Sequence, residues 1–123
     1  MSTLVIYHYP KCSTCVQALR WLREHAIAVE PVDITQSPPG VDELRQIAKL
    51  AQIAVPKLFN TSGVSYREGG FKDRLKHLST DEMLRALAAD GKLIKRPLIH
   101  GRALALVGFS AAAYAAAFTA DAP

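Results

Sequence analysis

The sequence predicts an α/β fold: a mixed four-stranded sheet with a helical insert between a βαβ half and a ββα half. Three observations favour this fold. A nearly continuous apolar run over residues 3–8 is followed closely by a segment with helical periodicity. The middle of the chain, residues 36–95, carries the signals of several helices. Two short apolar runs, 98–100 and 104–107, then flank a tight turn. We treat residues 1–123 as a single domain.

The first half is predicted to be a strand, a helix and a strand. The apolar run 3–8 is typical of a strand buried on both faces. From Ser13 to about Ala26, apolar residues recur every three or four positions, which predicts a helix. Residues 28–33 indicate a second strand, and Pro31 within it lacks a backbone donor. This strand is therefore expected at an edge of the sheet, in a right-handed βαβ unit.

The predicted insert opens after a proline- and glycine-rich turn at residues 37–40. Residues 41–51 have the apolar spacing of a helix. They are followed by a short apolar piece at 53–59, a turn at 60–63 and a short helix at 71–77.

A capping box predicts where the last helix of the insert begins. Ser79 is followed three residues later by Glu82, and apolar residues at helical spacing come next. This helix is expected to end at Asp90-Gly91, with the glycine as its C-terminal stop.

The C-terminal part is predicted to be a hairpin and a closing helix. Runs 98–100 and 104–107 flank Gly101-Arg102, and residues 111–118 follow a turn. The resulting order is that of a thioredoxin-like sheet. Although 103–120 is an uncharged stretch of 18 residues, alanine dominates it and is only weakly apolar. We therefore predict strand, turn and helix here, and no membrane span.

Charge and composition narrow the possible partners. The net charge of +4 is compatible with an anionic ligand. The basic residues are spread along the chain, so no direct contact with nucleic acid is expected. The N-terminus carries no basic segment followed by an apolar core, so we expect a cytoplasmic protein with reduced thiols.

The two cysteines of the chain, Cys12 and Cys15, lie where the first strand meets the first helix. A thiol reacts as its thiolate, and the positive end of a helix stabilises a negative sulfur. Lys11 adds a positive charge nearby. We predict a lowered pKa for Cys12, which would be the attacking sulfur. Cys15, one turn further along the helix, would be more buried and act as the resolving thiol.

Two other interpretations of the pair are a half zinc site and two inert buried cysteines. Zinc usually takes four ligands, and the four histidines are scattered without a metal-binding spacing. We therefore expect no metal. The strand-to-helix context favours redox chemistry over either interpretation.

Arg96-Pro97 is the second candidate feature, because a proline that opens a strand can hold a cis peptide bond. In a thioredoxin-like sheet the cis-proline loop lies beside the reactive cysteine, so Arg96 would face the sulfur and any bound anion. The alternative is a solvated surface arginine next to Lys95. Pro56, in an Ala-Val-Pro segment, competes for the cis position.

The chain resembles the arsenate reductase-related Spx/MgsR family over nearly its whole length. The matching segments are YPKCSTC at 9–15, FNTSG at 59–63 with YRE at 66–68, FKD at 71–73, and DGKLIKRPLI at 90–99 with VGF at 107–109. The resemblance implies a thioredoxin-like core, Cys12 as the reactive thiol and Arg96 as an anion-contacting residue. It also assigns the cis bond to Pro97 rather than Pro56.

The first-turn motif supplies further candidates. Ser13 and Thr14 follow Cys12 directly, so we expect them to bind an anionic substrate group together with Lys11 and Arg96.

Members of the family differ in activity. Its arsenate reductases use one cysteine, take electrons from glutathione and glutaredoxin, and hold the oxyanion with several arginines. Their Gly-Thr-Ser-Arg run is replaced here by residues 13–16, Ser-Thr-Cys-Val. A later arginine is replaced around Val107-Gly108. Loss of these cationic donors would weaken oxyanion binding.

Two other branches of the family keep features of this chain. Spx is a redox-sensing regulator that binds the RNA polymerase alpha subunit through a CxxC-controlled switch. Small thiol reductases thought to use glutathione have an ending similar to residues 106–110 with Tyr114.

The functional prediction is a thiol–disulfide oxidoreductase with no bound cofactor, linked to glutathione, glutaredoxin or thioredoxin. The alternatives are a Spx-like regulator that binds the RNA polymerase alpha subunit, and a glutathione- and glutaredoxin-dependent arsenate reductase.

Overall fold

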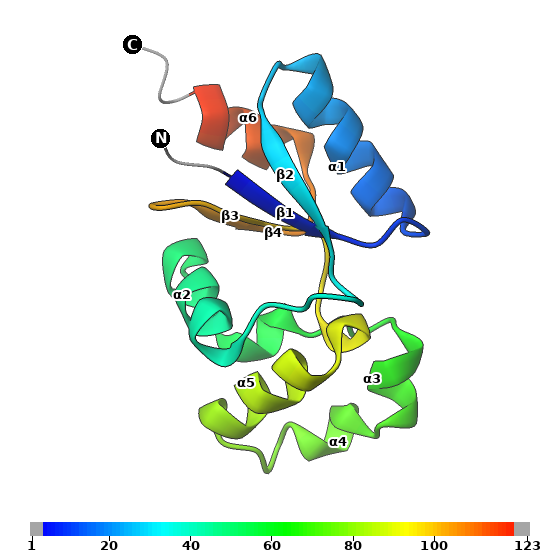
Figure 1. Cartoon of the computed structure of the whole chain (residues 1–123). Helices are drawn as coiled ribbons and strands as arrows, with labels where there is room; N and C mark the ends of the chain where they lie inside the picture. The colour runs from blue at the N-terminus through cyan, green and yellow to red at the C-terminus, as the bar shows by residue number, and fades with distance from the viewer. Residues whose placement is uncertain (1–3, 120–123) are drawn as a thin grey trace.

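The computed structural model describes residues 4–119. Thr3, predicted to open the first strand, lies outside these residues. In Figure 1 a central sheet separates α1 and α6 from the helices of the insert. In chain order the elements are β1 (Leu4–His8), α1 (Ser13–Glu24), β2 (Val29–Asp33), α2 (Val41–Ala51), η1 (Val55–Leu58), α3 (Val64–Glu68), α4 (Phe71–Arg74), α5 (Thr80–Ala89), η2 (Gly91–Leu93), β3 (Leu98–His100), β4 (Ala105–Val107) and α6 (Ala111–Thr119).

The sheet has the order β2-β1-β3-β4. β1 pairs in parallel with β2 and antiparallel with β3, and β3 pairs antiparallel with β4. The prediction of a mixed four-stranded sheet with a helical insert is therefore confirmed. Pro31 lies opposite Ile6 in the edge strand β2, where its missing donor disturbs no second neighbour. Gly101 N–H donates to the Leu104 carbonyl at 2.8 Å and closes the predicted hairpin.

Successive residues of β1 face opposite sides of the sheet, and both sides are covered. Ile6 is fully buried in a cluster with Leu22 of α1 and Tyr114 of α6. Tyr7 is 8% exposed and packs in the larger cluster with Leu98 and the insert. The nearly continuous apolar run of β1 follows from this burial on both faces. Of residues 4–119, no helix is long and apolar enough to cross a bilayer.

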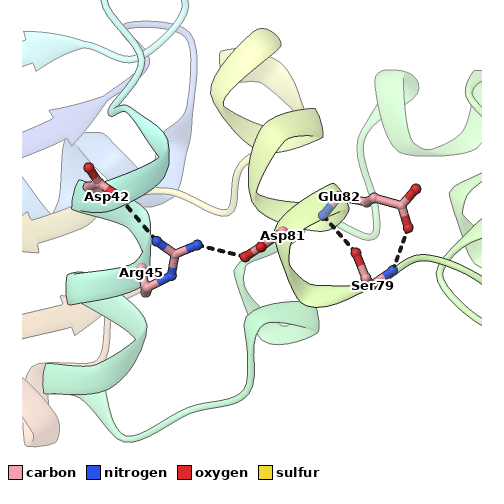
Figure 2. A network of polar contacts seen from close by, with 5 residues as sticks. All are labelled: Asp42, Arg45, Ser79, Asp81 and Glu82. Carbon is pink, nitrogen blue, oxygen red and sulfur yellow. Dashed lines mark hydrogen bonds and ion pairs between the residues drawn. The ribbon is translucent and has the colours of Figure 1, made fainter.

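Polar contacts at the surface stabilise the helices of the insert. At the start of α5, Ser79 and Glu82 form the predicted capping box: the Glu82 N–H donates to Ser79 Oγ at 3.1 Å, and the Ser79 N–H donates to Glu82 Oε1 at 2.8 Å. Arg45 of α2 donates to Asp81 of α5 at 2.7 Å and to Asp42 at 3.2 Å (Figure 2). These ion pairs are exposed and contribute about 1 kcal/mol or less.

The predicted end of α5 at Asp90-Gly91 is confirmed, because the helix ends at Ala89, but the predicted role of Gly91 as its C-terminal cap is wrong. The residue after α5, Asp90, is extended with φ −148°, and Gly91 begins η2 instead of adopting a left-handed conformation. A Cβ at Gly91 would lie 1.8 Å from the carbonyl oxygen of Ile34, just after β2. Glycine is therefore required here because another segment of the chain passes close by, which a local pattern does not reveal.

The first part of the insert also differs from local expectation. α3 was not predicted, and the predicted helix 71–77 is α-helical only over Phe71–Arg74. Within the apolar piece 53–59, Val55–Leu58 form a 3-10 helix. Phe59 then forms an antiparallel bridge with Ile94. This pairing joins residues far apart in sequence, so periodicity along the chain gives no sign of it.

A polar contact joins the sheet to α2 within the larger apolar cluster. The Tyr7 hydroxyl donates to the carboxylate of Glu43 at 2.8 Å, and His100 Nδ1 lies 3.0 Å from the same carboxylate. Burial raises the pKa of Tyr7 further above neutrality, and the Glu43 carboxylate raises it too. The Tyr7 hydroxyl therefore stays protonated and donates a hydrogen bond, and its only partner among the described residues is Glu43.

Replacing Gly91 with alanine is expected to destabilise the fold. The added Cβ overlaps the Ile34 carbonyl, and relief of such an overlap costs about 1–3 kcal/mol or more. Gly40→Ala is the matched control, because nothing lies within 4 Å of a Cβ built there. Urea unfolding of both variants measures the difference, and equal stability would contradict the close approach.

Replacing Glu43 with alanine is expected to lower stability by about 1–3 kcal/mol, because it leaves the Tyr7 hydroxyl unpaired. Asp42→Ala removes the neighbouring acidic side chain, which is 99% exposed, and should cost less than about 0.5 kcal/mol. Glu43→Gln keeps an acceptor and should lie between them. Urea midpoints of the three variants test this order, and an Asp42→Ala loss as large as the Glu43→Ala loss would contradict it.

Candidate functional site

Cys12 is the N-cap residue of α1. β1 ends at His8, and a turn in which the Cys12 N–H donates to the Tyr9 carbonyl at 2.9 Å leads into the helix. Cys12 is extended, and its Sγ accepts the backbone N–H of Cys15 at 3.4 Å. A sulfur at this position satisfies one of the unpaired N–H groups of the first turn.

Cys15 lies one turn further along α1, and it is fully buried. Its Sγ accepts the backbone N–H of Tyr9 at 3.5 Å. Burial raises the pKa of the Cys15 thiol to about 12, and the neighbouring Cys12 sulfur adds to the rise, although the Tyr9 N–H opposes it. Cys15 is therefore a protonated thiol at neutral pH.

The two sulfurs have opposite pKa shifts. Burial by itself raises the pKa of Cys12, but three interactions outweigh it: the thiol of Cys15, the backbone N–H of Cys15 and the positive charge of Arg96. The net pKa of Cys12 is therefore lowered. Lys11 is not among the groups that lower it; its side chain is exposed and lines the cleft beside Cys12.

Arg96 is fixed between η2 and β3. Its guanidinium lies 5.0 Å from the centre of the Tyr9 ring and donates to the Lys92 carbonyl at 3.3 Å. The peptide bond between Arg96 and Pro97 is cis. Pro56 stands in the first turn of η1, so the competition between the two prolines is settled in favour of Pro97. The interpretation of Arg96 as a freely solvated side chain does not fit these contacts.

A cleft of about 730 Å³ opens beside Cys12. Five of the predicted site residues line it, namely Lys11, Cys12, Ser13, Thr14 and Arg96. Cys15 is buried behind Cys12 and does not line it. The volume falls within the range of small-molecule sites, about 300–1,000 Å³.

Two walls of this cleft were not predicted as parts of a site. One comes from the insert and the other from the end of β4 and the start of α6. Their lining residues are Asn60, Ser62, Gly63 and Val64 in the first, and Leu106, Val107, Gly108, Phe109, Ser110, Ala113 and Tyr114 in the second. The segments contain the FNTSG motif at 59–63 and the VGF motif at 107–109, and these motifs were the sequence signal that could have assigned both segments to the cleft.

The insert wall is held in place by backbone pairing. The Asn60 N–H donates to the Leu93 carbonyl at 2.8 Å, and the Lys95 N–H donates to the Leu58 carbonyl at 2.7 Å. These bonds flank the bridge of Phe59 with Ile94. They place the 60–63 turn next to Arg96, although the two segments are more than thirty residues apart.

The opposite wall is held by Tyr114, which is buried in α6. Its hydroxyl donates to the Gly108 carbonyl at 3.0 Å, and its ring meets the Phe109 ring edge-on at 4.8 Å. Gly108 has a φ of +80°, a conformation that favours glycine. Burial raises the pKa of Tyr114, and the Cys15 sulfur nearby adds to this rise, so the phenol remains a donor.

Metal binding finds no support in the described part of the chain. Across residues 4–119 no group of three or more histidine, cysteine, aspartate or glutamate side chains could hold a metal ion. Cys12 and Cys15 are both free thiols.

The chain is similar to known proteins over most of its length. The model of the ArsC family matches residues 7–117. Uncharacterized protein YusI of Bacillus subtilis is 44% identical over 107 residues, which cover 87% of this chain and 91% of that protein. An arsenate reductase of Neisseria meningitidis is 33% identical over 88% of this chain and 92% of its own. The crystal structure of a putative ArsC family related protein from Bacteroides fragilis superposes with a TM-score of 0.88 at 38% identity, covering 91% of this chain and 94% of that one.

Replacing Arg96 with alanine is expected to raise the pKa of Cys12, because it removes the positive charge that favours the thiolate. At neutral pH less thiolate is then present, and alkylation by iodoacetamide slows. The rate should regain its wild-type plateau at higher pH. Arg102→Ala, in the exposed hairpin turn, is the matched control. An unchanged pH profile in Arg96→Ala would contradict the electrostatic role.

Proposed function

The chain belongs to the ArsC family, and on this basis we propose that it is a thiol–disulfide oxidoreductase in which Cys12 attacks and Cys15 resolves. The observation that carries the proposal is the pair itself: the Cys15 N–H lies 3.4 Å from Cys12 Sγ, and the two thiols have opposite pKa shifts. The lowered pKa of Cys12 supplies the thiolate that attacks. The raised pKa of Cys15 keeps the second thiol protonated until the mixed disulfide has formed.

In the first step the Cys12 thiolate attacks one sulfur of a substrate disulfide. A bond forms between Cys12 Sγ and that sulfur, the substrate S–S bond breaks, and the other half leaves as a thiolate that takes a proton from water. Arg96 and the N–H of Cys15 stabilise the anionic sulfur before the attack.

In the second step Cys15 attacks Cys12 Sγ and releases the remaining substrate thiol. Formation of the mixed disulfide removes the negative charge of Cys12, which contributes to the raised pKa of Cys15. The proton of Cys15 passes to the departing thiolate, and the N–H of Tyr9 stabilises the attacking sulfur. The substrate gains two electrons and the protein is left with a Cys12–Cys15 disulfide.

Two electrons must then return to this disulfide. We propose that glutathione supplies them, either directly or through glutaredoxin or thioredoxin, which implies a reducing compartment and thus a cytoplasmic protein. Lys11, Ser13, Thr14 and Arg96 line the cleft where a glutathione carboxylate would lie beside Cys12.

Arsenate is the less favoured substrate. Three cations line the cleft, Lys11, Lys95 and Arg96, but Arg96 is the one arginine among the described residues that does so. A tetrahedral oxyanion is best held by several bidentate guanidinium groups, whereas a lysine offers only a point charge. This lining suits a peptide thiol better than a small oxyanion.

Disulfide reduction, coupled to NADPH, glutathione and glutathione reductase, tests the proposal. Wild-type protein should turn over hydroxyethyl disulfide, and Cys12→Ser should show no turnover because the attacking sulfur is lost. Cys15→Ser should accumulate a mixed disulfide with one glutathione, seen as a mass adduct.

Arsenate, tried in the same assay with glutaredoxin added, should be reduced more slowly than the disulfide. A protein that forms the Cys12–Cys15 disulfide reversibly, but turns over neither substrate, would contradict an enzyme. That outcome would favour the redox regulator, to be tested by binding to the RNA polymerase alpha subunit.

A further inference from the structure

Arg96 borders two cavities. Besides the cleft at Cys12, a smaller cavity of about 200 Å³ is lined by Tyr9, Asn60, Gly63, Val64, Ser65, Lys92 and Arg96. Four of these residues, Asn60, Gly63, Val64 and Arg96, also line the larger cleft. The two cavities are therefore neighbours with a shared wall.

The charged residues that line the two cavities are all positive. Lys11, Lys95 and Arg96 line the cleft, and Lys92 lines the smaller cavity with Arg96. Among residues 4–119, no aspartate or glutamate lines either one. None of these four cations takes part in an ion pair within residues 4–119. Unpaired cations gathered around a concave surface attract an anionic ligand.

Arg96 is held for such a ligand. The Tyr9 ring and the Lys92 carbonyl fix its guanidinium, and the bond to that carbonyl uses only one of its five N–H donors. A fixed guanidinium binds a carboxylate with less loss of side-chain freedom than a flexible one. Lys92 is exposed and also lines the smaller cavity, so a second cation belongs to that lining.

We infer that the smaller cavity is a carboxylate subsite formed by Lys92 and Arg96. Its ligand is a disulfide of a small cysteine-containing peptide, whose carboxylate lies between these two cations while its sulfur faces Cys12. The cavity is smaller than a typical site for a whole small molecule, about 300–1,000 Å³, so it suits one end group of a longer ligand. The inference deepens the proposed function and rests on it for the identity of the reacting group.

Substrate charge tests the subsite. Turnover is measured with oxidised glutathione, which is anionic, with hydroxyethyl disulfide, which is neutral, and with cystamine, which is cationic. Lys92→Ala should lower kcat/KM for oxidised glutathione by about fivefold, the size expected for one partly solvated charge contact. Lys92→Glu should lower it further. Lys92→Ala should leave hydroxyethyl disulfide within about twofold of wild type, because a neutral disulfide makes no charge contact there.

Two controls separate the subsite from general electrostatic attraction. Lys49→Ala removes one positive charge from α2, at an exposed position that lines neither cavity. It should change kcat/KM for oxidised glutathione by less than about twofold. Lys92→Arg keeps the charge and should retain most of the wild-type value. Equal losses in Lys49→Ala and Lys92→Ala would overturn the inference, as would equal losses on anionic and neutral disulfides.

A ligand that binds but cannot react separates the test of the subsite from the test of the proposed function. S-methylglutathione has no free thiol, and its binding can be followed through the backbone amide signals of the protein in NMR. The expected result is a shift of the Ser65 and Tyr9 amides, which line only the smaller cavity, in wild type and a weaker shift in Lys92→Ala. Shifts confined to the Cys12 cleft would overturn the subsite. Failure of wild type to reduce any disulfide would instead overturn the proposed function, while the NMR result would still decide the subsite.

Discussion

The proposed chemistry depends on an anionic sulfur at the first turn of α1. Cys12 occupies the N-cap position, where the N–H of Cys15 points at its sulfur. A thiolate there replaces the usual oxygen acceptor of an N-cap, and Arg96 adds a full positive charge. Burial disfavours the Cys12 thiolate, but the interactions that favour it are together larger, so the net pKa is lowered.

The same geometry separates the roles of two identical side chains. Cys15 is three residues further along the helix, on the same face, but it is fully buried and carries the raised pKa. Each sulfur affects the other: the Cys15 thiol stabilises the Cys12 anion, and that anion disfavours a charge on Cys15. The proposed two-step exchange uses this coupling, because the first step removes the charge that restrains the second.

The insert does more than enlarge the fold. By pairing residues 58–60 with 93–95 it brings the 60–63 turn to Arg96 and closes the cleft on one side. Three cations line the cleft, Lys11, Lys95 and Arg96, and only one of them is an arginine, which is why arsenate is proposed as the less favoured substrate although a similar protein is an arsenate reductase.

The sequence by itself determined the elements with strong local signals and the candidate cysteine pair. The apolar run of β1, the edge position of Pro31 and the capping box at Ser79 were predicted because each is encoded within a few neighbouring residues. Cys12 and Cys15 were found the same way, through a spacing that places both on one helix face.

Only the tertiary structure decided what surrounds that pair. The walls contributed by the 60–63 turn and by Tyr114 come from segments far from Cys12 in the chain. Gly91 was misread as a helix stop because its constraint is the passing backbone of Ile34, a contact between distant residues. Lys11 and Arg96 were both expected beside the Cys12 sulfur, but only Arg96, which reaches it from across the fold, is among the groups that lower its pKa. Local sequence patterns encode the backbone conformation of single elements. A site is formed by side chains from separate elements, and tertiary packing decides which of these side chains come together.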